Sequence, residues 1–369
     1  MIRWTEAGEE RSAPWRSALG APPPTRVVIA DDRMKADTAY RLACEGTALL
    51  WRGDFQNARQ LLQAMGRRCR PADPGATFYQ YRQAQGQRAR TLGMLLIPYD
   101  EGHRIPLARA PDVRQACEEV YGPAAGPAVG QLRELLGLIG AHEWRKKGVE
   151  VPALGARIHP HYGVFSPIRG EYVDLVAQAP LPDKRLAFEL GTGTGVLAAV
   201  LAKRGVERVV ATDLDPRAVA CARDNLARLD LADRVEVVAA DLFPAGRAPL
   251  VVCNPPWLPA KPSSLLDQAV YDPGGRMLQG FLDGLAEHLE PGGEGWLVLS
   301  DLAEHLGLRS RADLMAAFDA AGLRVVDRLD TRPRHRRASE STDPLSAARA
   351  AEVTSLWRLA VQVSLNARR

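Results

Sequence analysis

The fold is decided by one stretch, residues 189–195, which reads Glu-Leu-Gly-Thr-Gly-Thr-Gly. It follows a β-type run, Arg185–Leu190, and precedes a helical pattern, Val196–Arg204, which Gly205 closes. Glycines let the backbone turn sharply and approach a ligand closely, and the N-terminus of the next helix faces that ligand. The glycines fall at every second position, whereas a dinucleotide loop has the spacing G-x-G-x-x-G. The stretch therefore predicts a ligand loop that differs from a dinucleotide loop.

Short β-type runs alternate with amphipathic helices on both sides of this loop. The further strands that we expect are Arg208–Asp213, Val235–Ala239, Leu250–Cys253, Trp296–Ser300, Arg324–Leu329 and Val353–Val363. Among the helices, Met277–Leu289 is expected to stop before Pro291-Gly292-Gly293. The alternation predicts an α/β fold in which helices cover both faces of a parallel sheet.

Two acids end successive strands after the glycine loop. Asp213 ends the second strand, where a carboxylate can accept hydrogen bonds from two ribose hydroxyls. Asp241 follows the third strand, where it can receive the amino group of an adenine. Either acid alone could equally well be a helix cap or a loop residue. Together with Glu189 on the first strand, however, they lie in order on three successive strands, which favours a nucleoside site.

This arrangement resembles the class I S-adenosylmethionine-dependent methyltransferases over about residues 160 to 365. The resemblance implies a Rossmann-like seven-stranded sheet whose last strand is antiparallel, and S-adenosyl-L-methionine as the cofactor. It also implies a set of cofactor-binding residues: Glu189, Gly191, Thr192, Gly193, Gly195, Asp213, Leu214, Asp241, Leu242 and Asn254.

A tetrapeptide, Asn254-Pro255-Pro256-Trp257, comes directly after the fourth strand. An amide or aryl amine nitrogen is a poor nucleophile because its lone pair is delocalised. The Asn254 side-chain oxygen and the rigid Pro255 carbonyl can accept both N–H groups and favour a pyramidal nitrogen. Trp257 offers a flat face for a planar target. The tetrapeptide resembles the N-P-P-[YFW] motif of amino-group methyltransferases, which implies catalytic roles for Asn254, Pro255, Pro256 and Trp257.

Two branches of that group compete. Residues 161–166 resemble the G-V-F-S lead-in of ribosomal RNA guanine-N2 methyltransferases, although Leu258 stands where those enzymes usually have histidine. Residues 166–171 resemble, one residue short, the entry motif of release-factor glutamine methyltransferases, whose tetrapeptide carries tyrosine. In both branches Phe165, Trp257 and Tyr271 are expected on the substrate side. A base amine in RNA is our first prediction, protein glutamine the alternative, and a small molecule or a cofactor-binding protein without turnover remain open.

The length of 369 residues suggests more than one domain. We expect a flexible arm at 1–26, a mixed, mainly helical substrate-recognition domain at 27–150, and the methyltransferase domain at 151–369. Seven arginines against one acid, Asp73, lie between residues 56 and 90: Arg59, Arg67, Arg68, Arg70, Arg82, Arg88 and Arg90. Such a segment suits RNA or an acidic protein surface as much as it suits a solvated helix.

Other features restrict the class of protein. No apolar run approaches the roughly 20 residues that span a bilayer, so no membrane partner is expected. The five scattered cysteines form no C-x-x-C pair, which favours a reducing, cytoplasmic location. His159 and His161 have the only ligand-like histidine spacing, which we interpret as part of a strand entry, and we expect no metal.

Overall fold

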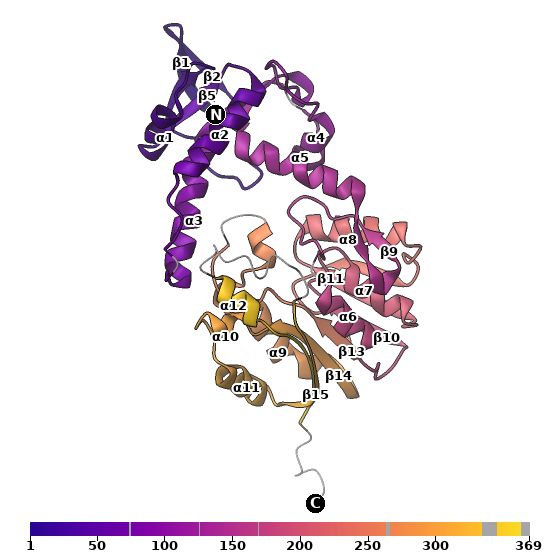
Figure 1. The fold of residues 1–369 in the computed structure, drawn as a ribbon. Helices are drawn as coiled ribbons and strands as arrows, with labels where there is room; N and C mark the ends of the chain where they lie inside the picture. Colours follow the sequence, from indigo (N-terminus) through magenta and orange to yellow (C-terminus); the bar gives the residue numbers. More distant parts are fainter. Residues whose placement is uncertain (74, 125, 169, 263–265, 334–344, 363–369) are drawn as a thin grey trace, which may run out of the picture. The chain divides into compact units, whose positions relative to one another are not determined.

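The computed structural model describes residues 1–369 except 74, 125, 169, 263–265, 334–344 and 363–369. The chain forms two compact units, Met1–Trp144 and Arg145–Arg369 (Figure 1). Within the described residues, no helix combines the length and apolar character needed to cross a membrane.

The second unit is built on a seven-stranded sheet with the order β12-β11-β10-β13-β14-β16-β15. The strands are β10 (Leu186–Leu190), β11 (Arg208–Asp213), β12 (Val235–Ala239), β13 (Ala248–Cys253), β14 (Leu289–Ser300), β15 (Leu323–Thr331) and β16 (Thr354–Val361). β10 to β14 pair in parallel, and β16 runs antiparallel to both of its neighbours, β14 and β15. The predicted α/β sheet with a reversed last strand is confirmed. The expected end of that strand, Val363, lies outside the described residues.

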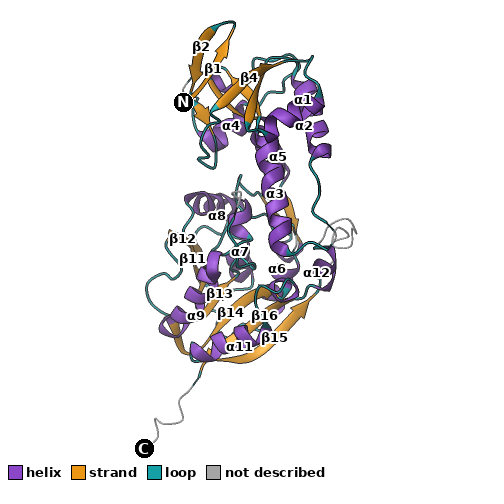
Figure 2. Ribbon diagram, turned by 90° about the vertical axis from the view of Figure 1, so that its left-hand side faces the viewer, coloured by secondary structure: helices purple, strands orange, loops and turns teal. Residues whose placement is uncertain are grey.

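Successive residues of the central strands point to opposite faces of this sheet, and both faces are buried. Ala187 and Leu250 face one core, whereas Phe188 and Val251 face the other. The first core is closed by α6 (Glu171–Gln178), α7 (Val196–Lys203) and α8 (Pro216–Arg228); the second is closed by α9 (Arg276–His288) and α11 (Arg311–Ala320). Figure 2 shows these helices around the sheet. Two shorter helices, α10 (Leu302–His305) and α12 (Ser346–Ala351), and a β8–β9 hairpin (Val149–Val151, Ala156–Ile158) complete the unit.

Local signals explain where several helices begin. The Asp215 carboxylate accepts from the Arg217 N–H at 2.9 Å and caps α8, whose first residue is Pro216. Ser310 and Asp313 form a capping box at the start of α11. The helix expected at Met277–Leu289 is α9 and ends before Pro291-Gly292-Gly293, whereas the strand expected at Trp296–Ser300 is longer, because β14 begins at Leu289 and runs through these residues.

The first unit also contains a sheet, with the order β3-β7-β6-β5-β4. Its strands are β3 (Trp15–Arg16), β4 (Arg26–Ala30), β5 (Thr47–Trp51), β6 (Leu95–Tyr99) and β7 (Ala128–Gln131). Its helices are α1 (Ala36–Cys44), α2 (Phe55–Arg68), α3 (Phe78–Gly93), α4 (Arg114–Tyr121) and α5 (Leu132–Lys147). Helix α5 continues past residue 144, where this unit ends. β4, β5 and β6 are parallel, and β7 is antiparallel to β6. The unit is therefore α/β, and more of its residues lie in helices than in strands, as expected of a mixed, mainly helical domain.

The N-terminal segment corrects a further expectation. Instead of a flexible arm, β1 (Ile2–Glu6) and β2 (Glu9–Ala13) form an antiparallel hairpin. Ile2 is fully buried in a core that it shares with Leu50 and Leu96, so this hairpin is part of the folded unit. Its short strands carry five Glu and Arg residues among ten, which hid them from a reading by hydrophobic pattern.

Candidate functional site

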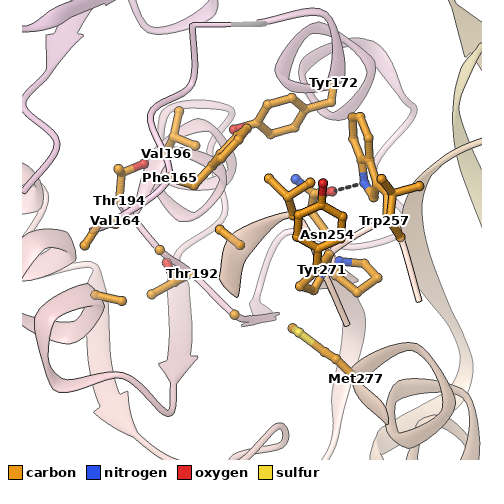
Figure 3. Close-up of a pocket in the computed structure, with 18 of the residues that line it drawn as sticks. Val164, Phe165, Tyr172, Thr192, Thr194, Val196, Asn254, Trp257, Tyr271 and Met277 are labelled. Atoms are coloured by element: carbon orange, nitrogen blue, oxygen red, sulfur yellow. Dashed lines mark hydrogen bonds between the residues drawn. The ribbon is translucent and has the colours of Figure 1, made fainter. Parts of the chain in front are cut away.

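A cavity of about 550 Å³ opens in the second unit at the carboxyl ends of β10, β11 and β13 (Figure 3). Ligands bind at this end of the strands in open parallel sheets. The structure brings eleven of the sequence-predicted residues to its wall: Phe165, Glu189, Gly191, Thr192, Gly193, Asp213, Asn254, Pro255, Pro256, Trp257 and Tyr271.

The glycine loop forms the floor of the cavity, and its glycines serve different purposes. Gly191, Gly193 and Gly195 all have positive φ, between 55° and 80°, which favours glycine. A Cβ on Gly193 would meet no atom within 4 Å, so this residue leaves room beside the cavity. A Cβ on Gly195 would lie 3.2 Å from the Ala222 Cα, so Gly195 permits the close approach of α8.

Two buried carboxyl groups stand at the ends of adjacent strands. Glu189 is 2% exposed and accepts a hydrogen bond from the Thr192 hydroxyl. Burial raises the pKa of Glu189 to about 7, and the nearby Asp213 adds to this effect, although the Thr192 hydrogen bond opposes it. Burial also raises the pKa of Asp213, although its carboxylate accepts from the backbone N–H groups of Gly193 and Asp215 at 2.9 Å. Both acids therefore lack a countercharge that a cationic, hydroxyl-bearing ligand can supply.

The first residue of the tetrapeptide is oriented by the last. The Trp257 indole N–H donates to the Asn254 side-chain oxygen at 2.9 Å (Figure 3). One lone pair of that oxygen is thus used, and one remains for another donor. The sequence suggested a stacking face for Trp257, but this hydrogen bond was not anticipated.

The chain beyond the tetrapeptide returns to the same place. Leu258 and Tyr271 form an isolated bridge, with Leu258 N–H donating to the Val270 carbonyl at 3.1 Å and Asp272 N–H to the Leu258 carbonyl at 2.8 Å. The Asp272 carboxylate then accepts from the Met277 N–H at 2.9 Å, near the start of α9. These bonds fix Tyr271 beside the tetrapeptide. We call the bridge and its two flanking bonds the loop neck.

Four predicted cofactor residues do not line the cavity: Gly195, Leu214, Asp241 and Leu242. Leu214 is 64% exposed. Asp241 pairs with Arg276, and its side chain is about half exposed. Leu242 has a positive φ of 67°, and its carbonyl accepts from the Thr212 hydroxyl at 2.5 Å.

Other cavity residues were not anticipated from the sequence: Gly163, Val164, Tyr172, Thr194, Val196, Leu197, Asp215, Ala218, Leu258, Ala269, Val270, Met277, Leu302, Leu345, Arg349 and Glu352. Tyr172 belongs to an amphipathic helix whose pattern indicates only core packing. Arg349 and Glu352 come from α12 and the residue that follows it, between the last two strands, and no motif marks them. No group of three or more His, Cys, Asp or Glu suited to a metal ion occurs in the part of the chain that the structure describes.

Comparison with known families identifies the second unit. Residues 156–321 match the family model of the methyltransferase small domain. The unit is a class I S-adenosylmethionine-dependent methyltransferase domain. The match spans the glycine loop, the acids after three strands and the tetrapeptide, so the predicted family and cofactor are confirmed at the level of this domain.

Three relatives are similar in sequence to part of this chain. A release factor glutamine methyltransferase of Cereibacter sphaeroides is 34% identical over 180 residues, which cover 45% of this chain and 63% of the relative. A Methanocaldococcus jannaschii protein whose name assigns it to the protein N5-glutamine methyltransferases is 28% identical, covering 42% of this chain and 80% of that protein. A ribosomal protein L11 methyltransferase of Chelativorans is 30% identical, covering 52% of this chain and 58% of the relative. The chain thus spans less than two thirds of the first and third relatives.

Proposed function

We propose that the methyltransferase domain is an N-methyltransferase that acts on a planar amide or amine nitrogen. The observation that carries this proposal is that Asn254 and Pro255, whose side-chain and main-chain oxygens can act as acceptors, lie next to each other on the cavity wall. Because Trp257 fixes the Asn254 carboxamide, its oxygen presents one remaining lone pair in a set direction. Such preorganised acceptors favour a pyramidal nitrogen, a geometry that a free amide nitrogen rarely adopts.

The residues of the other half of the cavity would hold S-adenosylmethionine. In our proposal Asp213 accepts from the ribose hydroxyls, the open space beside Gly193 admits the ligand, and Glu189 lies near its positive charges. Asp241, Leu214 and Leu242 stay candidates for contacts at the adenine end. When bound, S-adenosylmethionine supplies a methyl group on a positively charged sulfur.

The chain's own contribution to the reaction is positioning and hydrogen bonding. Asn254 and Pro255 hold the N–H groups of the target while the nitrogen lone pair is directed at the methyl carbon. With the cofactor bound, its methyl group would pass to this nitrogen as the C–S bond breaks, and the nitrogen would release one proton. Phe165, Trp257 and Tyr271 provide aromatic surface for a planar target on this side of the cavity.

Protein glutamine is the substrate that we propose first. The names of two relatives describe methyl transfer to glutamine, and both are similar to a little under half of this chain. A glutamine side chain has the planar amide that the two acceptors fit, and its methylene groups suit the apolar wall of the cavity. This reverses the order of preference that the sequence motifs alone suggested.

A base amine in RNA is the second candidate, and one observation favours it. Arg59, Arg67, Arg70 and Arg90 of the first unit are exposed and have no acidic partner among the described residues. Arg68 pairs with Asp37, and Arg88 donates to the Gly66 carbonyl, so these two have structural roles. The remaining arginines can contact a phosphate backbone.

One experiment separates the candidates. Purified protein is incubated with S-adenosylmethionine labelled in the methyl group and with protein, RNA and metabolite fractions of a cell extract, and Asn254→Ala serves as the inactive control. We expect label in protein, recovered as N5-methylglutamine after digestion. Label in RNA that decreases steeply with added salt would establish the second candidate instead. Equal labelling by wild type and Asn254→Ala would contradict the mechanism.

A further inference from the structure

Glu352 lies at the same edge of the sheet as the tetrapeptide and on the side away from the glycine loop. The sheet order places β13, which leads into Asn254, between β10 and β14. Ser300 ends β14, and its hydroxyl donates to the Glu352 carboxylate at 2.7 Å. Glu189 and Asp213 belong to β10 and β11, on the other side of β13. Glu352, which lines the cavity, therefore belongs to its substrate side.

The chain that carries Glu352 is held firmly against the end of β14. The Val353 N–H donates to the Asp301 carboxylate at 2.7 Å, and the Asp301 N–H donates to the Val353 carbonyl at 3.0 Å. Helix α12, which precedes Glu352, contacts α10 (Figure 1). Glu352 is only 1% exposed although it lines the cavity. Its carboxylate is thus positioned in advance to accept a hydrogen bond from a bound substrate.

Arg349 brings hydrogen-bond donors to the same wall. It lies on α12, three residues before Glu352, and it also lines the cavity. Residues at this spacing are neighbours on a helix, with about 5–6 Å between their Cβ atoms. A guanidinium only donates and a carboxylate only accepts. The end of α12 therefore offers a donor and an acceptor side by side.

The charges around the cavity disfavour a polyanionic substrate. Among the lining residues that the structure describes, Arg349 is the only lysine or arginine, and four are acids: Glu189, Asp213, Asp215 and Glu352. A phosphate group beside Arg349 would also lie close to the carboxylate of Glu352. A peptide group is neutral and carries one donor and one acceptor. In an extended chain the N–H and the carbonyl of one residue point to the same side, so adjacent acceptor and donor groups can bind both.

We propose that Arg349 and Glu352 bind the main chain of the polypeptide whose glutamine is methylated, with Arg349 donating to a carbonyl and Glu352 accepting from an N–H group. The inference rests on the proposed function, because it takes protein glutamine as the substrate. It makes the end of α12 the element that positions the polypeptide, while Asn254 and Pro255 bind the side-chain amide.

Two small competitors test this assignment on the full chain. N-acetylglutamine methylamide has the side-chain amide and a peptide group on either side of it, whereas butanamide has only the side chain. Each is added while the protein fraction of the extract is methylated. We expect N-acetylglutamine methylamide to inhibit the wild type at concentrations about tenfold or more below those of butanamide, because only the first has peptide groups.

Arg349→Met keeps an apolar stem of similar length and removes the donors. It should raise KM for the protein substrate by about 10- to 100-fold, the value of one hydrogen bond to a charged group. It should also remove most of the difference between the two competitors. Inhibition by butanamide and the affinity for S-adenosylmethionine, measured by calorimetry, should stay within about twofold of wild type.

Glu352→Gln keeps an oxygen for the Ser300 hydroxyl and loses the negative charge. Its effect on KM and on the competitors should have the same pattern and be smaller, about five- to tenfold, because a neutral acceptor replaces a charged one. Arg324→Met is the matched control, because Arg324 on β15 is exposed and does not line the cavity. This control should match the wild type in every measurement.

Failure of this inference differs from failure of the proposed function. If wild type does not label protein, or labels it no better than Asn254→Ala does, the proposed function itself fails. If wild type labels protein but the two competitors inhibit equally or not at all, or neither variant changes their ratio, binding of the main chain is overturned. A loss of cofactor affinity in both variants would make the two residues structural and overturn it as well. Label in RNA that Arg349→Met reduces would assign the pair to a nucleotide instead.

Discussion

The two units use similar strand–loop–helix connections in different ways. In the first unit, the acids after the parallel strands are satisfied by the protein itself: Asp32 accepts from the Asp54 N–H at 3.0 Å and from Asn57 at 2.9 Å, and Asp54 pairs with Arg109 at 2.7 Å. In the second unit, Glu189 and Asp213 occupy comparable places and face a cavity.

The pKa values of these acids are shifted in opposite directions in the two units. The hydrogen bond from Arg109 lowers the pKa of Asp54, whereas burial raises the pKa of Glu189 and Asp213. A parallel sheet therefore does not make a ligand site by itself. The site arises where a glycine loop leaves space and the acids are left without cations, and substitutions in both units together with a pH series test this contrast.

Asn254→Ala should have the largest effect. Loss of the side-chain acceptor should lower turnover by about 100- to 1000-fold, as for other preorganised hydrogen-bonding groups, while cofactor affinity stays within a few-fold. Trp257→Phe keeps a smaller aromatic face and removes the N–H that holds Asn254, so its loss should be smaller than that of Asn254→Ala, about tenfold. Steady-state kinetics with calorimetry measure both. Near-normal turnover of Asn254→Ala would contradict the proposed chemistry.

Asp213→Ala tests the cavity-facing acids directly. We expect S-adenosylmethionine to bind about 10- to 100-fold more weakly, because a carboxylate that accepts from hydroxyls is lost. Asp54→Ala is the matched change in the first unit. It removes the cap of α2 and the pair with Arg109, so it should lower the unfolding temperature and leave cofactor affinity unchanged. Similar losses of affinity in both variants would erase the contrast between the units.

The raised pKa of Glu189 predicts a pH dependence. The folded protein holds this proton more tightly than the unfolded chain, so the free protein loses stability as pH rises from 4.5 to about 7. A bound cation favours the carboxylate, so cofactor binding should release a proton. Affinity should therefore rise by about tenfold between about pH 6 and pH 8 and then level off.

Asp54 gives the opposite trend, because its lowered pKa means that its contribution to stability is lost as pH falls. Glu189→Gln is the control for the binding effect, since the amide does not titrate while Thr192, Tyr172 and Asp213 remain around it. Calorimetry in buffers of different ionisation enthalpy counts the protons released. The same pH profile in wild type and Glu189→Gln would assign the effect elsewhere.

Asp241→Ala should have the smallest effect. Asp241 is half exposed and paired with Arg276, and such exposed pairs contribute little. We expect cofactor affinity to change by about threefold or less. A loss as large as that of Asp213→Ala would restore Asp241 to the principal cofactor contacts that the sequence suggested.

The sequence predicted the second unit well because its signals are local. β11 and β12 have the expected bounds, and α8 begins with two local signals for a helix start, Asp215 as its cap and Pro216 as its first residue. In the first unit, β5 has no alternating pattern, because its five consecutive residues are all buried, and such a short run does not distinguish a strand from a buried helix segment. The hairpin at Ile2–Ala13 was missed because its two strands carry many charged residues and show no hydrophobic alternation.

The sequence motifs predicted those site residues that lie within or next to the glycine loop and the tetrapeptide. They did not predict the hydrogen bond between Trp257 and Asn254, which depends on side-chain rotamers. They also missed Tyr172 and Glu352, which reach the cavity through tertiary packing of α6 and of the chain after α12. The positions of Asp241 and Leu214 show the converse, because residues adjacent to a motif need not line the cavity that the motif builds.

The loop neck has a consequence for how this enzyme class can diversify. Leu258 is hydrogen-bonded to Val270 and Asp272, the two neighbours of Tyr271. The chain between Leu258 and Tyr271 therefore leaves the cavity wall and returns to it at one point. We therefore expect changes of length or composition there to leave Asn254 and the start of α9 in register. Grafting this segment between homologues should then leave the tetrapeptide and its chemistry in place.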